Sequence, residues 1–235
     1  MKLLRLKLFQ ETACYLKPFS FKVGETFPLA PFSTVNGMLH AVLEATEYIP
    51  MKLSIQGKAE SFIVDYQKKF MYKKAEVPPI VTLDGLQEQV EYDSKLFSTM
   101  PMYQHLLYNV EHIIHIDAEE HILQQLHEKL YNLNTALSLG RWEDLVRIDE
   151  VDFVDVEEKD LEEIPYNQYV PIKQLDDIFG KVQGHPYYRL PCKYTAYDGR
   201  REWDYVLVAH VPNGEALESN VLSDRDDYPV FLMEG

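Results

Sequence analysis

The feature that most constrains the fold is the order in which hydrophobic periodicity changes along residues 1–158. The opening KLLRLKLF alternates and places Leu4, Leu6 and Leu8 on one face, which predicts a half-buried strand. Alternating or β-rich segments also cover 51–57, 60–72, 106–117 and 145–156, whereas 33–45 and 118–133 show helical spacing. The resulting order, strand, helix, strand, inserted arm, strand, helix, strand, predicts an α+β fold of the ferredoxin-like or RRM-like type.

Both predicted helices carry start signals. Ser33 follows Pro31 and is the expected N-cap of the first helix. Gly37 lies one turn inside that helix, where the missing side chain allows close approach of another backbone or a ligand. Asp117 is the expected cap of the second helix. The predicted buried face of that second helix consists of Ile122, Leu123, Leu126 and Leu130.

Two segments fall outside this unit. Residues 68–101 contain KK twice and PP once without a clear period, which predicts an inserted arm or hairpin. After the acidic stretch EEKDLEEIP, the chain has two β-rich runs around Asp198 and Gly199, a strong hairpin signal. We therefore predict a domain over 1–158, with the arm inserted at about 68–101, and a small β-rich C-terminal extension over 159–235.

The charge of the chain is strongly asymmetric. Its net charge is −15, which taken alone argues against nucleic-acid binding, because phosphates need lysine and arginine partners. Residues 1–74, however, hold 11 lysines and arginines against six acids, a net charge of +5, while the remainder nets −20. This asymmetry predicts a polyanion-binding surface in the first third and an acidic surface that faces water or basic partner proteins. The acidic part could equally serve only solubility.

Several functional classes are disfavoured by what the sequence lacks. It has no uncharged apolar run of 18 residues and no signal-peptide pattern in MKLLRLKLFQET, so we expect a cytoplasmic protein with no membrane partner. Cys14 and Cys192 form no CxxC pair, and no Cys/His set completes a metal site. No P-loop, dinucleotide-binding or GxSxG motif is present, so we expect no metal and no cofactor.

The segment 17–37 has the chemistry of a phosphate site. Lys17 and Lys22 precede a predicted helix N-terminus, where backbone N–H groups and the hydroxyls of Ser33 and Thr34 could bind a phosphate. Four aromatic residues in this segment could stack on unpaired bases or could fill the core, and we favour the core. These residues are Phe19, Phe21, Phe27 and Phe32.

A second candidate is the turn in SLGRWEDL, residues 138–145. Gly140 allows a backbone to approach a ligand closely, and the guanidinium of Arg141 could fork onto a phosphate. The alternative is a helix end at Gly140 with an exposed Arg141, which composition alone favours.

Histidines in HIIHIDAEEH invite a catalytic or metal-binding interpretation, which their spacing opposes. In a strand His112 and His115 point to opposite faces, so the two cannot share a ligand. Acid–base cleavage of RNA by a histidine remains chemically possible, but spacing assembles no catalytic set.

The quoted segments also resemble a known family. LFQETACYLKPFSFKVGETFPLAPFSTVNGMLHAVL, followed by YIPMKLSIQG, resembles the N-terminal signature of CRISPR-associated protein family five, a RAMP-superfamily subunit of type I Cascade complexes. SLGRWEDL is similar to the LGRxEDL motif of that family, and YPVFLMEG is similar to the end of the type I-B branch. The N-terminal and SLGR motifs are specific in combination.

The resemblance implies an RRM-like domain with a β-hairpin thumb, which matches the arm at 68–101. It implies a subunit that caps the 5′ handle of crRNA, next to the Cascade backbone subunit and the large subunit, and that contacts target DNA indirectly. The expected RNA-binding residues lie in 17–40, in 138–141 and on the arm. They are Lys17, Phe19, Ser20, Lys22, Thr26, Ser33, Thr34, Gly37, His40, Ser138, Leu139, Gly140, Arg141, Lys68 and Lys69.

Three hypotheses follow for the function. The first is a structural RNA-binding subunit with no catalytic residues. The second is a repeat-specific endoribonuclease that processes precursor crRNA, as in the type I-C branch, although the catalytic Tyr, Lys and His set of that branch cannot be matched here. The third is a protein-interaction scaffold in which the acidic C-terminal part does the main work.

Overall fold

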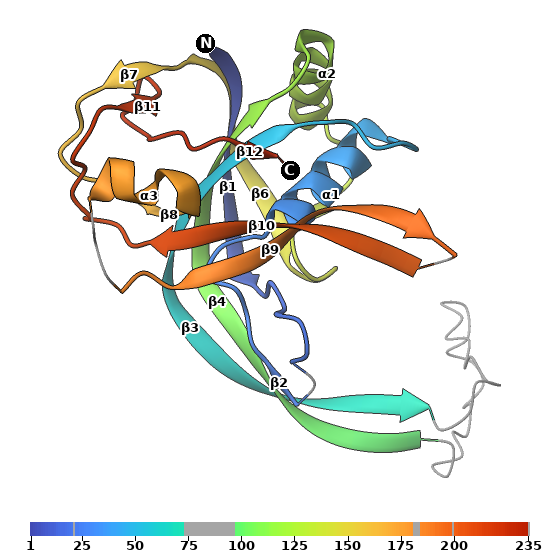
Figure 1. Cartoon of the computed structure of the whole chain (residues 1–235). Helices are drawn as coiled ribbons and strands as arrows, with labels where there is room; N and C mark the ends of the chain where they lie inside the picture. Colours follow the sequence, from blue (N-terminus) through green and yellow to red (C-terminus); the bar gives the residue numbers. More distant parts are fainter. Residues whose placement is uncertain (21, 73–96, 181–183, 199, 235) are drawn as a thin grey trace.

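Four long antiparallel strands form the centre of the computed structural model, which describes residues 1–20, 22–72, 97–180, 184–198 and 200–234 (Figure 1). Their order in the sheet is β6-β1-β4-β3, and α1 and α2 connect them in the ferredoxin-like manner that the sequence predicted. The elements are β1 (Lys2–Ala13), α1 (Phe32–Leu43), β3 (Lys52–Tyr72), β4 (Phe97–Asp117), α2 (Glu120–Tyr131) and β6 (Leu145–Asp155).

Both helices cover one face of this sheet, and the sequence periods explain why. The alternating residues Leu4, Leu6 and Leu8 are buried in the same cluster as the apolar face of α1. The predicted face of α2 is confirmed, because all four of its residues join that cluster: Ile122, Leu123, Leu126 and Leu130. No described helix has the length and apolar character needed to span a bilayer.

The helix starts differ from the prediction. The N-cap of α1 is Pro31, whose carbonyl accepts the N–H of Thr34 at 3.0 Å, and Ser33 lies inside the helix without a capping bond. The helix begins one residue early because Phe32 is fully buried in the core. Asp117 is also not a cap: it remains in β4 opposite Lys52, and α2 starts after Glu119. Tertiary pairing therefore overrides both local capping signals.

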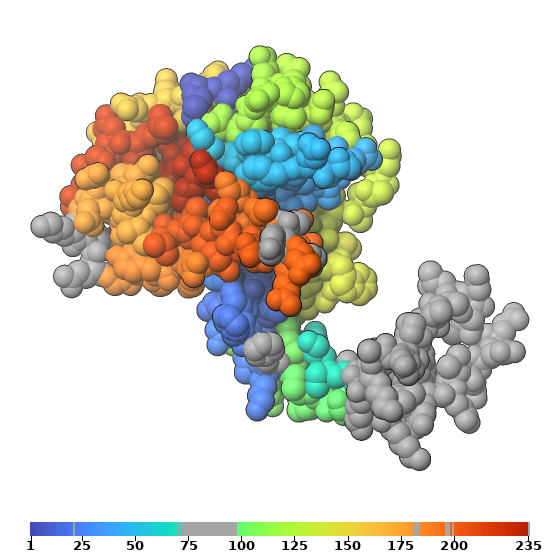
Figure 2. Space-filling model, turned by 45° about the vertical axis from the view of Figure 1, so that its right-hand side comes forward, coloured from blue at the N-terminus to red at the C-terminus, as the bar shows by residue number. Residues whose placement is uncertain are grey.

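β3 and β4 are each 21 residues long and continue past the body of the protein as a two-stranded arm (Figures 1 and 2). The segments 51–57 and 60–72, predicted as separate strands, are one strand paired with β4 from Lys52↔Asp117 to Tyr72↔Phe97. The parts of the predicted arm at 68–72 and 97–101 are thus regular β-ladder. Its remaining residues, 73–96, lie outside the described residues.

The C-terminal part adds strands to the same sheet beyond β3. β8 pairs with β3 at Gln56↔Gln168, β10 pairs with β8, and β9 pairs with β10. The hairpin predicted around Asp198 is confirmed, because Tyr197 pairs with Arg200; Gly199 lies outside the described residues. This hairpin crosses α1 (Figure 1). The elements are β8 (Asn167–Pro171), α3 (Ile172–Phe179), β9 (Tyr187–Tyr197) and β10 (Arg200–Val211).

Short strands complete the fold. β2 pairs with β4, β5 pairs with β6, β12 pairs with β3, and β7 and β11 form a separate two-stranded sheet. Their bounds are β2 (Val23–Gly24), β5 (Leu137–Ser138), β7 (Glu157–Lys159), β11 (Val221–Ser223) and β12 (Met233–Glu234).

A buried ion cluster fixes the C-terminal segment to the sheet face opposite the helices. The guanidinium of Arg5 pairs with Asp224 at 2.5 Å, with Asp226 at 2.6 Å and with Glu150 at 2.5 Å. Asp224 also accepts a bond from His115 Nε2 at 3.0 Å. Arg5 alternates with the buried leucines and so lies on the other face of its strand, yet it is fully buried, because a segment more than 200 residues away covers that face.

Candidate nucleic-acid interface

Backbone hydrogen bonds join the two halves of the loop that follows β1, as expected of an ordered loop. Phe27 N–H donates to the carbonyl of Tyr15 at 2.8 Å, and Lys17 N–H donates to the carbonyl of Glu25 at 2.8 Å. The Thr26 hydroxyl accepts the N–H of Tyr15 at 2.9 Å. Thr26, an expected RNA contact, therefore has a positioning bond inside the loop. Residue 21 lies outside the described residues.

The far end of this loop is fastened to the arm through Gly24. β2 runs parallel to β4, with Gly24 opposite Gln104. The Gln104 amide donates to the Gly24 carbonyl at 3.1 Å and to Cys14 Sγ at 2.6 Å. A side chain at position 24 would collide with the Gln104 amide, so this approach requires glycine. The loop therefore lies between the body and the arm (Figure 2).

The 138–144 turn is organised around a fully buried carboxylate, that of Asp144. Its oxygens accept the backbone N–H of Arg141 at 2.9 Å and the guanidinium Nη2 at 2.6 Å. Gly140 has φ +111°, and a Cβ there would lie 2.9 Å from both Asp144 Oδ2 and the Cys14 carbonyl. Gly140 thus has the positive φ that glycine favours, and it follows β5 and does not end a helix; its close approach is to Asp144 and Cys14, and approach to a ligand stays a prediction.

Arg141 is less free than the sequence suggested. Its guanidinium forks onto Asp144 and also pairs with Glu143 at 2.9 Å, and its side chain is 21% exposed. Burial disfavours the charge of Arg141, but the hydrogen bonds and charge of Asp144 outweigh it and raise the pKa of Arg141 above its ordinary value. The guanidinium therefore fixes the turn, and contact with a phosphate stays a prediction.

The structure joins the 138–144 turn to the end of β1, from which the 17–37 segment continues. Asp144 Oδ2 accepts the N–H of Cys14 at 2.9 Å, across 130 residues of sequence. The Gln10 amide donates to the carbonyls of Leu139 and Asp144, each at 2.9 Å. Leu139, named as a contact, is itself buried, and Ser138 is half-buried. The loop and the turn therefore form one surface over a shared buried support.

Tyr15 and His112 extend this support inward. The Tyr15 hydroxyl donates to Gln10 Oε1 at 2.6 Å and accepts from His112 Nε2 at 2.7 Å. Both rings are buried, and burial raises the pKa of Tyr15 and lowers the pKa of His112 to about 4. His112 is therefore neutral at pH 7 and serves as a positioning group.

The solvent side of this surface carries aromatic and basic side chains. Phe19 is 88% exposed with φ +65°, and Trp142 is 86% exposed. Lys22 is exposed and has no ion pair among the described residues, whereas Lys17 pairs with Glu25 at 3.3 Å. Ser20 is half-buried beside them.

The remaining predicted RNA contacts lie in different environments. Phe27 and Phe32 are buried, so the core interpretation was right for these two aromatics, and Phe21 lies outside the described residues. Lys68 and Lys69 are exposed on the arm, and no ion pair within the described chain involves either of them. The loop reaches this part of the arm, because β2 pairs with Tyr103 and Lys68 faces Pro101 two residues further along β4.

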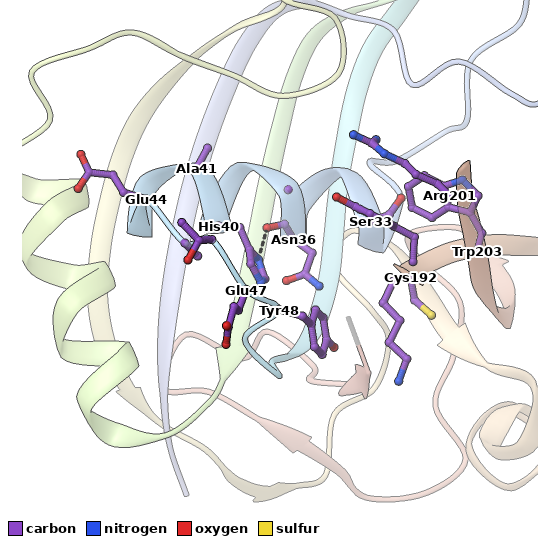
Figure 3. Close-up of a pocket in the computed structure, with 15 residues that line it drawn as sticks. Ser33, Asn36, His40, Ala41, Glu44, Glu47, Tyr48, Cys192, Arg201 and Trp203 are labelled. Atoms are coloured by element: carbon purple, nitrogen blue, oxygen red, sulfur yellow. Dashed lines mark hydrogen bonds between the residues drawn. The ribbon is translucent and has the colours of Figure 1, made fainter. Parts of the chain in front are cut away.

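The α1 residues belong to a different hollow. Ser33, Gly37 and His40 line a groove of about 610 Å³ between α1, the residues that follow it and the β9–β10 hairpin (Figure 3). Thr34, in the same turn, is half-buried and is not among the lining residues. His40 Nδ1 donates to the Asn36 carbonyl at 2.8 Å and Nε2 accepts the Ile49 N–H at 2.9 Å, so both ring nitrogens are occupied.

Sequence reasoning missed the residues on the far wall of this groove. Lys193, Tyr194, Arg201 and Trp203 line it from β9 and β10. The run DGRREW could have drawn attention to Arg201 and Trp203, but no local pattern indicates that the hairpin lies over α1. Asn36, also missed, is a buried amide on the helix side.

The histidines do not form a metal site. His112 contacts Tyr15 on one face of β4, and His115 contacts Asp224 on the other, as their spacing predicted. No group of three potential ligands is present within the described ranges.

Comparison with known proteins identifies the fold. A chain of a "CRISPR RNA-guided surveillance complex" is 14% identical over 91% of both chains with a TM-score of 0.56. A "CRISPR protein from Archaeoglobus fulgidus" is 12% identical over 100% of this chain and 99% of its own, with a TM-score of 0.48. A chain of the type III-B Cmr-beta complex is 10% identical over 92% and 86%, with a TM-score of 0.45.

The distant structures identify only the fold, whereas the sequence assigns the chain to a family. No curated protein matches it. A family model described as CRISPR-associated protein (Cas_Cas5) matches residues 3–213, which include both the 14–31 loop and the 138–144 turn. With this match over most of its length, and with a ferredoxin-like sheet that carries an arm, the chain belongs to the CRISPR-associated protein (Cas_Cas5) family.

Proposed function

We propose that this protein binds the 5′ handle of a crRNA, without cutting it, as a subunit of a type I CRISPR effector complex of the I-B branch. In that complex it contacts the backbone subunit and the large subunit in the cytoplasm, and it supports recognition of target DNA indirectly. The family match and the resemblance of the N-terminal and SLGR segments support this function.

One observation carries the proposal. The two segments with phosphate chemistry outside the arm are far apart in sequence, yet Asp144 and Gln10 tie the 138–144 turn to the end of β1, which leads into the 17–37 segment, so that turn and segment share one surface. That surface presents Phe19, Trp142 and the exposed Lys22 to solvent. Exposed aromatics beside lysines suit a single strand, whose bases stack and whose phosphates attract cations.

A binding titration tests the proposal. The full-length protein is titrated with labelled RNA that carries the CRISPR repeat of its source genome, at several salt concentrations. The double variant Lys17→Ala/Lys22→Ala is expected to bind more weakly and to lower the log–log salt slope by about 1.4, because each lost single-strand phosphate contact removes about 0.7. Lys52→Ala, at the opposite end of β3 from the arm, is the control and should leave both quantities unchanged. Equal slopes for all three proteins would refute the assigned surface.

Incubation of the same RNA with and without EDTA tests the absence of catalysis. We expect intact RNA, because both ring nitrogens of His40 and the Nε2 atom of His112 are hydrogen-bonded within the protein, and burial lowers the pKa of His112 to about 4. Specific cut ends within the repeat would assign the endoribonuclease function instead. If the partner subunits assemble equally well after nuclease treatment, the chain is a protein scaffold and RNA contact is incidental.

A further inference from the structure

The groove over α1 has two chemically different ends. Arg201 and Trp203 lie at the end near Ser33, whereas Glu44 and Glu47 lie at the other (Figure 3). The Arg201 guanidinium stacks on the ring of Tyr194 at 4.6 Å, and no ion pair among the described residues neutralises it. An anionic group would therefore be attracted to the Arg201 end and repelled from the other.

Aromatic rings form much of the groove wall. The rings of Tyr194 and Trp203 are 5.2 Å apart from centroid to centroid, and Tyr48 lies on the helix side under the ammonium of Lys193. Between them Gly37 has open space where a Cβ would stand. A flat ring could enter here without displacing a side chain.

The floor of the groove contains an unused acceptor. Asn36 is 5% exposed, and its Oδ1 has no hydrogen-bond partner among the described residues. Its side chain projects from α1 toward Tyr48 (Figure 3). A buried carbonyl oxygen without a partner is unfavourable, so an incoming N–H donor would be favoured at this position.

We propose that this groove binds one unpaired nucleotide of single-stranded RNA. The base stacks against the Tyr194–Trp203 pair, an N–H of the base donates to Asn36 Oδ1, and the phosphate lies at Arg201. Aromatic faces, one acceptor and one free cation together match a nucleotide better than a peptide segment. The inference rests on the proposed function, because it takes RNA as the ligand, and adds to it a base-reading site separate from the loop and turn.

Trp203 is the reporter for the test. The chain has two tryptophans, so Trp142→Phe leaves Trp203 as the only indole. In this background, AMP and purine riboside 5′-monophosphate, which differ only in the amino group, are titrated while Trp203 fluorescence is followed. We expect saturable quenching by both, with AMP five- to tenfold tighter, as one added hydrogen bond to a buried acceptor implies.

Variants separate the contributions. Asn36→Leu is expected to erase the difference between the two nucleotides, whereas Asn36→Asp, which keeps an acceptor, retains it while weakening both. Arg201→Ala should weaken both nucleotides by the same factor. Arg189→Ala is the matched control, because Arg189 also stacks on a tyrosine of this hairpin, Tyr205 at 4.0 Å, but does not line the groove; it should change neither affinity. Circular dichroism confirms that each variant is folded.

The outcomes separate this inference from the proposed function. If neither nucleotide changes Trp203 fluorescence while repeat RNA still binds through the lysines, the groove is not a nucleotide site and only this inference fails. If repeat RNA also fails to bind the wild-type protein, in which Trp142 is intact, the proposed function fails as well. Quenching of Trp203 by the purified large subunit, with no effect of nucleotide, would assign the groove to a protein segment and overturn the inference.

Discussion

Replacing the buried carboxylate of Asp144 should weaken both the fold and RNA binding. Asp144→Ala removes the acceptor for the N–H groups of Cys14 and Arg141 and strands a guanidinium that is mostly buried. Breaking a buried charged pair costs about 3–5 kcal/mol, because the remaining partners lose solvation without compensation. For a chain of this size, that loss corresponds to a fall in melting temperature of roughly 6 to 20 °C.

Urea unfolding followed by circular dichroism measures this loss. Asp144→Asn, which keeps one acceptor and the side-chain volume, should lose less stability than Asp144→Ala. Asp149→Ala is the matched control, because its carboxylate pairs with the exposed Arg147 at 2.6 Å, and such solvent-screened surface pairs contribute little to stability. If Asp144→Ala and Asp149→Ala unfold at the same urea concentration, the carboxylate does not hold the two segments together. Repeat-RNA affinity should fall for Asp144→Ala and not for Asp149→Ala.

Three further predictions concern stability. Folding lowers the pKa of His112 from 6.5 to about 4, so the stability that His112 contributes is present above pH 6.5 and is lost as the pH falls through 4. Between pH 7 and 4.5, the free energy of urea unfolding should therefore change by about 2–3 kcal/mol less in His112→Gln than in the wild-type protein. Gly24→Ala should destabilise by about 1–3 kcal/mol through collision with Gln104, whereas Gly37→Ala, in open space within a helix, should stabilise by up to about 1 kcal/mol; the two melting temperatures should move in opposite directions. Arg5→Met should lose about 3–5 kcal/mol of unfolding free energy because it leaves a fully buried carboxylate without its main partner, and a loss under 1 kcal/mol would show that the cluster is solvated.

The element order could be predicted from sequence because each element buries one face. Leu4, Leu6 and Leu8 alternate as a strand requires, and the α2 residues recur at helical spacing. The predictions that failed concern residues whose partners are distant in the sequence. The break expected between 57 and 60 is absent because β4 pairs with β3 across it, Ala59 facing Val110. No local pattern reports such a pairing.

In the candidate site, too, the residue types could be recognised from the sequence, whereas their tertiary contacts could not. The loop and the turn were found from residue types that suit phosphate, but their junction through Asp144 and Cys14 needs the tertiary fold. Arg141 was expected to fork onto a phosphate; its guanidinium forks onto the carboxylate three residues later, and contact with a phosphate stays a prediction. The groove over α1 stayed hidden because Asn36 and Arg201 are brought together only by the hairpin that crosses the helix.

The Arg5–Asp224 pair, whose members are 219 positions apart, also sets an order of events during synthesis. Arg5 leaves the ribosome long before the carboxylate of Asp224, its most buried partner, has been synthesised. Until Asp224 is present, the C-terminal segment does not cover Arg5 on the outer face of β1, and His115 of β4 lacks its hydrogen-bond acceptor. We therefore expect the sheet to gain its final protection against amide hydrogen exchange only when the C-terminal segment docks, so that growing chains remain open on this face. Only a chain that already includes the Asp224 segment would then have a closed body from which to present its RNA-binding surface.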